Sequence, residues 1–359
     1  MRVVFRLDAD HRLGYGHLLR CLALAGVVAR RGGQVAFVMV RADPPACTMI
    51  EAQGWPWTIL SPRGPYASEV GLWKDANLGL FDAVVLDIAH QRTFRQLDQI
   101  PFYVNSLREH FGLVVLLDGL REHAIAARRP LMADLVVMPY PDADNLLPGT
   151  PARRLAGPEY GVFPAELLSQ VVLPRPVRNA ANRLLVTCGG SDPTRLTLLC
   201  LEALEKIADR HLLVRIAVAA GFAPELADTI TTRAAASRHQ VDILAAPKGL
   251  GTHMLWCDLA LTATGLTKYE LALTGTPSIQ ISIDPTHHAV NGSFAAQGTA
   301  LNLGIQESLS PATLADAICR TLDDVTQRQT MSRKGQTLVD GRGADRILDE
   351  MEALILARP

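Results

Sequence analysis

The feature that most constrains the fold of this chain is a glycine-containing loop between a predicted strand and a predicted helix, close to residue 1. The apolar run Val3-Val4-Phe5 predicts a buried strand, and helical spacing follows at the apolar residues Leu18, Cys21, Leu22 and Ala25. Gly14 and Gly16 lie in between and permit backbone angles and close ligand approach that a side chain would forbid. An open α/β sheet that binds ligands at the carboxyl ends of its strands is therefore expected.

The loop brings His17 to the first turn of the predicted helix, where open α/β sheets bind their ligands. The positive end of a helix dipole disfavours the imidazolium form, so we expect a neutral ring that accepts a proton near pH 7. Such a histidine is a candidate general base. The alternative is that His17 caps the loop or binds an anion.

Predicted strands and helical segments alternate along the chain, which indicates parallel βαβ units with helices on both faces of each sheet. Eight prolines interrupt regular structure between residues 139 and 182. A chain of 359 residues is expected to form two domains. We predict domains at residues 1–165 and 183–359 with a linker at 166–182. The helices expected from residue 311 onward form a tail of the kind that packs across both halves.

Acidic residues end predicted strands of the first half. Asp8 follows the first strand, Asp87 ends the apolar segment 81–87, and Asp118 ends the segment 112–118. The carboxyl ends of parallel strands share one edge of a sheet, so these carboxylates would lie close together. They either bind a ligand or cap the loops that follow, and both interpretations remain open.

The second half repeats the order of strand, glycine loop and helix. The predicted strand 183–188 is followed by Gly189-Gly190-Ser191, whose amides, with the next helix terminus, either cradle an anion or form a plain tight turn. A second strand ends at Thr264-Gly265, and a helix is expected to begin at Thr267. Glu270, one turn inside, can accept hydrogen bonds from a ribose diol, but the spacing also fits a capping box.

Two adjacent histidines, His287 and His288, follow the predicted strand 278–283. They do not predict a metal site, because no further ligands occur at suitable spacing. We expect residues 284–291 to form a polar loop that faces a cleft.

Composition limits the classes of function. A formal net charge of -1 argues against a general affinity for nucleic acid or anionic membranes. No apolar run approaches the ~20 residues of a membrane span, so stable membrane insertion is not expected. The six cysteines show no CxxC pair or metal-ligand spacing, which favours reduced thiols in a cytoplasmic protein.

Several of these motifs, taken together, resemble those of the UDP-sugar hydrolases of pseudaminic acid biosynthesis (PseG type) and of related spore-coat polysaccharide proteins. The similarity covers most of the chain. It is carried by Arg6-x-Asp8, Gly14-Tyr15-Gly16-His17-x-x-Arg20-Cys21, Gly157-Pro158-x-Tyr160, Gly189-Gly190-Ser191-Asp192-Pro193, the segment 264–277 and Asp340-Gly341-Arg342-Gly343-Ala344.

The resemblance implies a GT-B fold, in which two Rossmann-like domains with parallel sheets face each other across a cleft. It implies that His17 activates water for attack at the anomeric carbon, with UDP as the leaving group and without a metal or other cofactor. The implied sugar-side residues are Arg6, Asp8, Gly14, Tyr15, Gly16, Asp87, His287 and Asn291. The implied nucleotide-side residues are Gly189, Gly190, Ser191, Thr264, Gly265, Leu266, Thr267 and Glu270.

Two departures from the family pattern leave the sugar and the acceptor open. The family commonly has Asp-His-Tyr where this chain has Asp87-Ile88-Ala89-His90, and it tends to have Asn-Gln near Thr286-His287, where Asn291 is the candidate replacement. The leading hypothesis is hydrolysis of a UDP-diacetamido-trideoxyhexose. A glycosyltransferase that uses the same base and donor site with a hydroxyl acceptor is the alternative. A sugar-nucleotide-binding protein without turnover is the third hypothesis.

Overall fold

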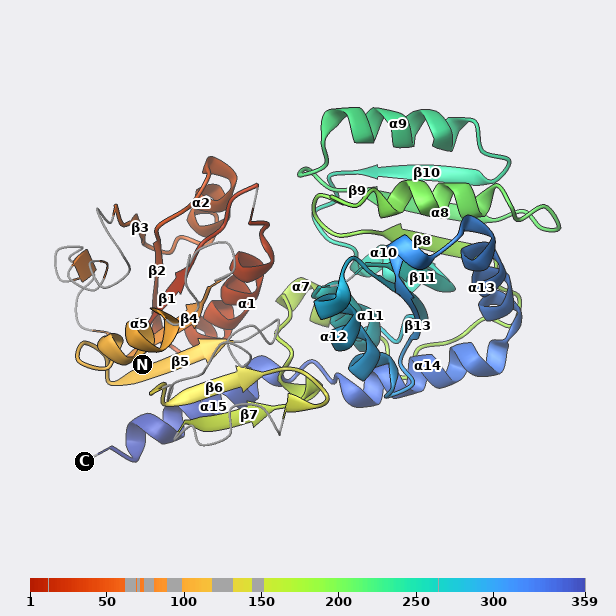
Figure 1. The fold of residues 1–359 in the computed structure, drawn as a ribbon. Coiled ribbons are helices and arrows are strands. Elements are labelled where there is room, and N and C mark those ends of the chain that lie inside the picture. Colours follow the sequence, from red (N-terminus) through yellow and green to blue (C-terminus); the bar gives the residue numbers. More distant parts are fainter. Residues whose placement is uncertain are drawn as a thin grey trace. The chain divides into compact units, whose positions relative to one another are not determined.

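The computed structural model of the chain describes residues 1–11, 13–61, 69, 72–73, 81–88, 99–117, 132–143, 152–263 and 265–358. The chain divides into two compact units (Figure 1). Unit 1 comprises Met1–Ala165 and Gly341–Pro359, and unit 2 comprises Glu166–Asp340.

Unit 1 contains a seven-stranded sheet in the order β3-β2-β1-β4-β5-β6-β7, in which all neighbouring strands are parallel. Its strands are β1 (Arg2–Leu7), β2 (Gln34–Met39), β3 (Trp57–Ile59), β4 (Ala83–Asp87), β5 (Leu113–Leu117), β6 (Leu135–Met138) and β7 (Arg153–Ala156). Its described helices are α1 (Gly16–Arg30), α2 (Pro44–Glu51), α5 (Gln99–Leu107), the 3-10 helix η2 (Pro158–Tyr160) and α15 (Gly343–Leu356). Helix α7 (Ala165–Gln170) spans the boundary between the units.

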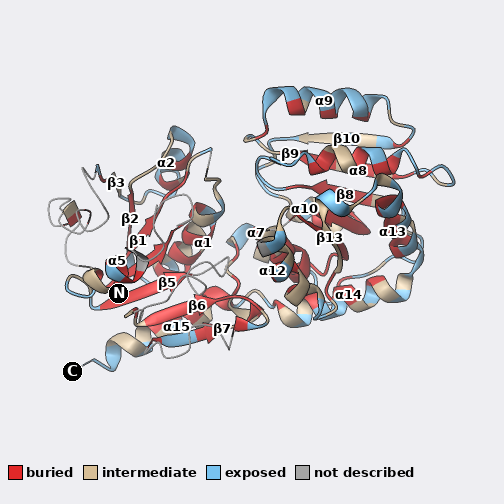
Figure 2. Cartoon of the chain, in the orientation of Figure 1, coloured by how far each residue is buried: buried red, intermediate tan, exposed pale blue. Residues whose placement is uncertain are grey.

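Both faces of this sheet are buried because the central strands are apolar throughout. Val3 and Phe5 of β1 face a core that α1, α2 and α15 close, whereas Val4 faces a second core closed by α5. Figure 2 shows the burial continuing along β5 and β6. Polar side chains are therefore left to the strand ends and the loops.

Unit 2 contains a six-stranded parallel sheet in the order β10-β9-β8-β11-β12-β13. Its strands are β8 (Arg183–Thr187), β9 (Leu213–Val218), β10 (Gln240–Ala245), β11 (Leu259–Thr262), β12 (Ser278–Ser282) and β13 (Leu301–Ile305). Its remaining helices are α8 (Leu196–Leu204), α9 (Pro224–Ala235), α10 (Gly251–Trp256), α11 (Thr267–Leu273), α12 (Pro285–Ala295), η3 (Gln306–Ser308), α13 (Pro311–Asp323) and α14 (Val325–Leu338).

The strand order reverses direction at one point in each sheet, between β1 and β4 in unit 1 and between β8 and β11 in unit 2. Open α/β sheets bind ligands in the crevice at this switch point, outside the carboxyl ends of the strands. The loops that follow β1, β4, β8 and β11 are therefore the first places to look for a site. The predicted residues His17, Gly189 and Glu270 all follow one of these strands.

Helix α15 belongs to unit 1, although residues 183–359 were predicted to form one domain. The physical reason is its apolar stripe, which is buried in the core of unit 1 at Ala344, Ile347, Leu348 and Met351. Arg31 of unit 1 reinforces the contact with ion pairs to Asp345 and Asp349. The chain therefore leaves unit 1 after residue 165 and returns at residue 341.

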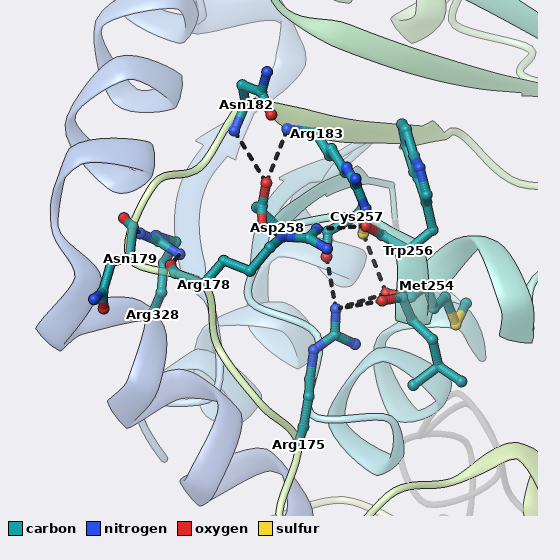
Figure 3. Close-up of polar contacts among 11 residues, drawn as sticks. Arg175, Arg178, Asn179, Asn182, Arg183, Met254, Trp256, Cys257, Asp258 and Arg328 are labelled. Carbon is teal, nitrogen blue, oxygen red and sulfur yellow. Dashed lines mark hydrogen bonds and ion pairs between the residues drawn. The ribbon is translucent and has the colours of Figure 1, made fainter.

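The predicted linker, residues 166–182, is part of unit 2 and is held there by buried polar contacts (Figure 3). Arg175 is 9% exposed, and its guanidinium donates to the carbonyl oxygens of Met254 and Cys257 at 2.9 and 2.6 Å. Asp258 accepts two backbone N–H groups at the end of the same segment. These bonds fix the segment to unit 2 rather than leaving it as a free connection.

The prediction of a polar loop at residues 284–291 is wrong, because helix α12 begins there. Asp284 is its N-cap and accepts the backbone N–H of His287 at 2.8 Å, and Pro285 occupies the first turn. A capping aspartate followed by proline is a strong helix-start signal. The short strand β7 was also missed, because it lies within the proline-rich stretch.

All six cysteines are free thiols in the structure, and four of them are buried. Among the helices that the structure describes, none has the length and apolar character that a membrane crossing requires.

Candidate functional site

The switch point of unit 1 brings together His17 and Arg20 of α1 and Asp87 at the end of β4. Nδ1 of His17 lies 2.6 Å from Oδ1 of Asp87, and Nε of Arg20 donates to Oδ2 at 2.6 Å. The Asp87 side chain is fully buried, whereas the His17 side chain is 16% exposed. His17 and Arg20 lie one helical turn apart, so a single carboxylate holds both.

Asp87 is ionised in this cluster. Burial alone would raise the pKa of the carboxyl group, but the charge of Arg20 and the contact with His17 outweigh burial, and the pKa of Asp87 lies well below its ordinary value. If the imidazole is neutral with its proton on Nδ1, the ionised Asp87 accepts that N–H and the lone pair lies on Nε2. No hydrogen bond to Nε2 occurs within the described part of the chain.

Asp87 was predicted to contact substrate. In the structure its carboxylate contacts Nδ1 of the His17 imidazole. Its oxygens accept from His17 and from Arg20, and its side chain has no exposed surface. The arrangement therefore orients His17 rather than the ligand itself. The sequence contained two signals for it: an acid that ends the strand next to β1, and an arginine three residues after His17.

Arg6 and Asp8 were also predicted to contact substrate, and both are fully buried. The Arg6 guanidinium donates to Asp8 Oδ1 at 2.8 Å and to the carboxylate of Glu69, which also accepts the hydroxyl of Tyr103 at 2.9 Å. Asp8 accepts two further backbone N–H groups from the loop after β2. These two side chains lie inside unit 1 and tie β1 to its neighbours, and their contact with a ligand stays a prediction.

The loop that carries His17 is itself fixed through Asp43, the N-cap of α2. Tyr15 donates its hydroxyl to Asp43 at 2.8 Å, and burial together with this hydrogen bond raises the pKa of Tyr15 to about 12. Gly14 has a φ of +83°, which only glycine adopts without strain, and Gly16 is exposed at the start of α1. The loop therefore presents His17 from a fixed backbone.

The glycine loop after β8 is open to a ligand. A Cβ placed at Gly189 or Gly190 would meet no atom within 4 Å, and Gly189 has a φ of +86°. Ser191 follows on the surface. The amino terminus of α8 was expected to help bind an anion. Its first two amides instead donate to Asp192, at 2.7 and 2.9 Å. The amides of Gly189-Gly190-Ser191 are the part of the predicted anion cradle that Asp192 does not use.

In a capping box, the carboxyl group of Glu270 would accept the backbone N–H of Thr267. The turn after β11 does not form this bond. Helix α11 has Leu266 as its N-cap and no side-chain capping bond, and Gly265 before it has a φ of +110°. No hydrogen bond to the Glu270 carboxyl group is made by the residues that the structure describes, and burial raises its pKa to about 7. Of the two interpretations of the Thr267–Glu270 spacing, the capping box is therefore excluded.

His287 and Asn291 both lie on α12. Nδ1 of His287 is 2.6 Å from Oδ2 of Asp284. Asn291 is fully buried and donates to Oγ of Ser282 at 3.0 Å, so it lies inside unit 2 rather than on a sugar-facing surface. Four other residues named in the sequence analysis lie outside the described residues: Ala89, His90, Asp118 and Thr264. Within the described ranges, no three His, Cys, Asp or Glu side chains are grouped to hold a metal ion.

No protein-family model matches the chain. It is 28% identical over 171 residues to the spore coat polysaccharide biosynthesis protein SpsG of Bacillus subtilis, with 48% of this chain and 50% of that protein covered. It is 28% identical over 224 residues to a UDP-N-acetylglucosamine--N-acetylmuramyl-(pentapeptide) pyrophosphoryl-undecaprenol N-acetylglucosamine transferase of Geobacter sulfurreducens, with 60% and 57% covered. The chain spans about half the length of the curated relatives it matches.

Solved structures resemble the chain over nearly its whole length. MurG of Acinetobacter baumannii has a TM-score of 0.70 at 16% identity and covers 98% of this chain and 99% of its own. HepE of Anabaena, in complex with UDP-glucose, has a TM-score of 0.61 at 14% identity and covers 98% and 100%. Together with the two parallel sheets of seven and six strands, these likenesses confirm the predicted α/β class and show that the chain has the GT-B fold.

Proposed function

We propose that this chain is a nucleotide-sugar enzyme in which His17 is the general base and unit 2 holds UDP. The arrangement that carries the proposal is the cluster of His17, Arg20 and Asp87 at the switch point of unit 1, with Nε2 left to meet a reactant. A UDP-sugar substrate is supported by the polysaccharide role in the name of SpsG, by the transferase of G. sulfurreducens and by the UDP-glucose complex of HepE.

In the proposed reaction, Nε2 of His17 removes a proton from water as the water oxygen bonds to the anomeric carbon. The bond from that carbon to the phosphate oxygen breaks, and UDP leaves with the electron pair. The imidazolium that forms is stabilised by Asp87, whose charge Arg20 maintains. Attack from the face opposite UDP inverts the anomeric carbon. The resemblance of the sequence to PseG-type hydrolases favours a UDP-diacetamido-trideoxyhexose as substrate, in pseudaminic-type acid biosynthesis.

The nucleotide is proposed to bind at the switch point of unit 2. The amides of Gly189-Gly190-Ser191 and of Gly265-Leu266-Thr267 would meet the diphosphate, and Glu270 would accept the ribose hydroxyls. This assignment is supported by the open space at the glycines and by the lack of a capping bond to Glu270.

A glycosyltransferase is the second candidate, and the match to the N-acetylglucosamine transferase favours it. In that reaction Nε2 of His17 takes the proton of an acceptor hydroxyl instead of that of water. The base, its partners and the nucleotide site are the same, so only the incoming nucleophile separates the two functions.

The test is to incubate the full chain with the UDP-diacetamido-trideoxyhexose and to measure free UDP and reducing sugar. The His17→Ala variant should lose about 10²–10⁴-fold in rate, the usual contribution of a general base, with unchanged affinity for UDP. His211→Ala, which removes an exposed imidazole at the amino end of β9, is the matched control and should keep the rate.

Each other outcome has a distinct meaning. UDP release that requires an added peptide, lipid or sugar hydroxyl assigns the transferase reaction. Equal rates for wild type and His17→Ala refute the assigned base. Tight binding of the UDP-sugar with no release under any of these conditions identifies a binding protein and refutes the enzymatic proposal.

A further inference from the structure

A row of polar side chains crosses the buried sheet of unit 2. Thr187, Thr262 and Gln280 occupy paired positions on β8, β11 and β12, and paired residues of a parallel sheet face the same side. They are 3%, 1% and 0% exposed. We call these three residues the polar row. Polar groups that are buried in this way destabilise a fold unless they find partners.

Several atoms in and beside the polar row have no partner within the described part of the chain. They are Oγ1 of Thr262, Nε2 and Oε1 of Gln280, and Oδ1 of Asn291 on α12. Asn291 is linked to the same sheet face, because its Nδ2 donates to Ser282, two residues after Gln280 on β12. The orphaned atoms therefore gather in one region of unit 2, where α11 and α12 cover the sheet.

Lys268 adds a buried positive charge from α11. It is 2% exposed, and the hydrogen bond of its Nζ goes to the carbonyl oxygen of Gly265 at 3.3 Å. Its Nζ also lies 5.1 Å from the centre of the Tyr269 ring. An ammonium group has three protons to donate, so one long bond leaves it poorly satisfied. Burial accordingly lowers the pKa of Lys268 to about 7.

The packing of α11 directs Lys268 toward the polar row. Leu271 shares a core with Leu185 of β8 and Ala260 of β11. Lys268 precedes Leu271 by three residues, so it lies on the same face of the helix, one turn nearer the carboxyl ends of the strands. On β8 and β11, the next residues on that sheet face belong to the polar row.

No ion pair with Lys268 occurs among the described residues. The other titratable groups of α11, and those of the strands and helices around it, are Tyr269, Glu270, Arg183, His253, Cys257, His287, His288, Arg328, Arg333 and Lys334. None of them lowers or raises the pKa of Lys268, for which burial is the one cause. Lys268 therefore has no anionic partner among the described residues.

We propose that Lys268 and the polar row form the inner side of a phosphate-recognition site, in which the ammonium pairs with the diphosphate of the bound nucleotide and Thr262 and Gln280 hold the ammonium or a bridging water. This inference rests on the proposed function and names the cation that recognises the leaving group. A nearby anion favours the charged form of a lysine, so Lys268 takes up a proton when UDP binds.

The experiment compares wild type, Lys268→Met and Lys206→Met by calorimetry at pH 8, with UDP and with uridine as probes. Lys206 is exposed after α8 and is the matched control. Lys268→Met should bind UDP about 10–100-fold more weakly, as expected for loss of a charge-assisted hydrogen bond, and should bind uridine as wild type does. Wild type should take up about 0.9 proton more per UDP than Lys268→Met, because a lysine with a pKa of about 7 is mostly neutral at pH 8.

Two further measurements test the inference without relying on the affinity of Lys268→Met for UDP, and the second uses the wild-type protein alone. At pH 6, where Lys268 is mostly charged, Lys268→Met should unfold at a higher temperature than wild type without UDP, because it removes a buried charge that has no counter-ion among the described residues. The chain has only five lysines, so ¹³C-labelled lysine can be followed by NMR in the wild-type protein. One lysine should titrate near pH 7 without UDP and well above that with UDP.

The outcomes separate the two proposals. If wild type does not bind UDP, the proposed function and this inference both fail. If wild type binds UDP but Lys268→Met has the same affinity and proton uptake, Lys268 is a packing residue and only this inference is overturned. Equal losses for UDP and uridine also overturn it, because uridine carries no phosphate.

Discussion

The two switch points of this chain contain polar clusters of opposite character. In unit 1 the charges of Arg20 and Asp87 are paired with each other, and Asp87 also holds His17. In unit 2, Lys268 has one carbonyl as a partner, and Glu270 has none among the described residues. A general base must be oriented before its reactant arrives. A side chain that binds a charged ligand, as is proposed for Lys268, binds it most strongly when no charged group of the protein already pairs with it. Under the proposed function, unit 1 carries the reaction and unit 2 the nucleotide.

Asp87→Asn is expected to have the largest effect, because it removes the carboxylate that holds the paired cluster of unit 1 together. The amide cannot stabilise the imidazolium, and Arg20 is left buried without a counter-charge. We expect the rate to fall by about 10²-fold or more and the free energy of unfolding to fall by about 3–5 kcal/mol. Steady-state rates and urea unfolding measure the two effects, and Asp209→Asn, at an exposed side chain, is the control.

The pH dependence of stability sharpens the same prediction. Folding lowers the pKa of Asp87 below the value of about 4 that an aspartate has in the unfolded chain. The ionised carboxylate therefore contributes its full stabilisation to the folded state above about pH 4, and this contribution is lost as the pH falls further. Wild type should therefore lose more stability than Asp87→Asn between about pH 4 and pH 2. Identical pH profiles, or an unchanged rate, would contradict the role of Asp87 as the partner of His17.

A smaller effect is expected from Glu270→Gln in unit 2. The pKa of Glu270 is raised to about 7, so its carboxylate is present above that pH and is lost as the pH falls through it. Glu270→Gln should bind UDP about tenfold more weakly than wild type at pH 8, and this difference should shrink at pH 6, where Glu270 of wild type is mostly protonated. Lys268 is present in both proteins, so its own titration cancels in the comparison. UDP that lacks the ribose diol is the control ligand, and wild type should bind it as poorly as the variant binds UDP. Equal binding of both ligands by wild type would rule out the assignment.

The smallest effect is expected from Tyr15→Phe, at the edge of the paired cluster in unit 1. Loss of the hydrogen bond to Asp43 should lower the free energy of unfolding by about 1 kcal/mol. The rate should change by no more than a few-fold, because His17 keeps Asp87 and Arg20. A large loss of rate with intact stability would instead assign Tyr15 to direct contact with the sugar.

Most of the sheet strands, although not β7 or β13, and the position of His17 could be predicted because they follow from short-range patterns. Apolar runs that end in glycine loops locate β1, β8 and β11, and the loop length puts His17 in the first turn of α1. The pairing of His17 with Asp87 joins residues 70 positions apart, so it depends on which strand lies beside β1. That neighbour is a property of the sheet order and not of local sequence.

Sequence reasoning missed the buried Lys268, the start of α12 and the place of α15, because general rules on burial and periodicity favoured other interpretations. Lysine is rarely buried, so the pattern around Thr267 drew attention to Glu270 and passed over Lys268. Asp284-Pro285 carried a helix-start signal, but the adjacent histidines suggested a loop. The apolar stripe of α15 is visible in the sequence, yet periodicity says that a helix is amphipathic without saying which core it completes.

The return of α15 to unit 1 has a consequence for synthesis on the ribosome. The core of unit 1 includes Ile347, Leu348 and Met351, so it remains unfinished while unit 2 is being translated and is completed only after α15 emerges. The residues that precede unit 2 are therefore made before it but complete their core after it. Premature termination within unit 2 would release a chain whose oldest part exposes an apolar surface, and quality-control proteases could recognise such a product before it acted on any substrate.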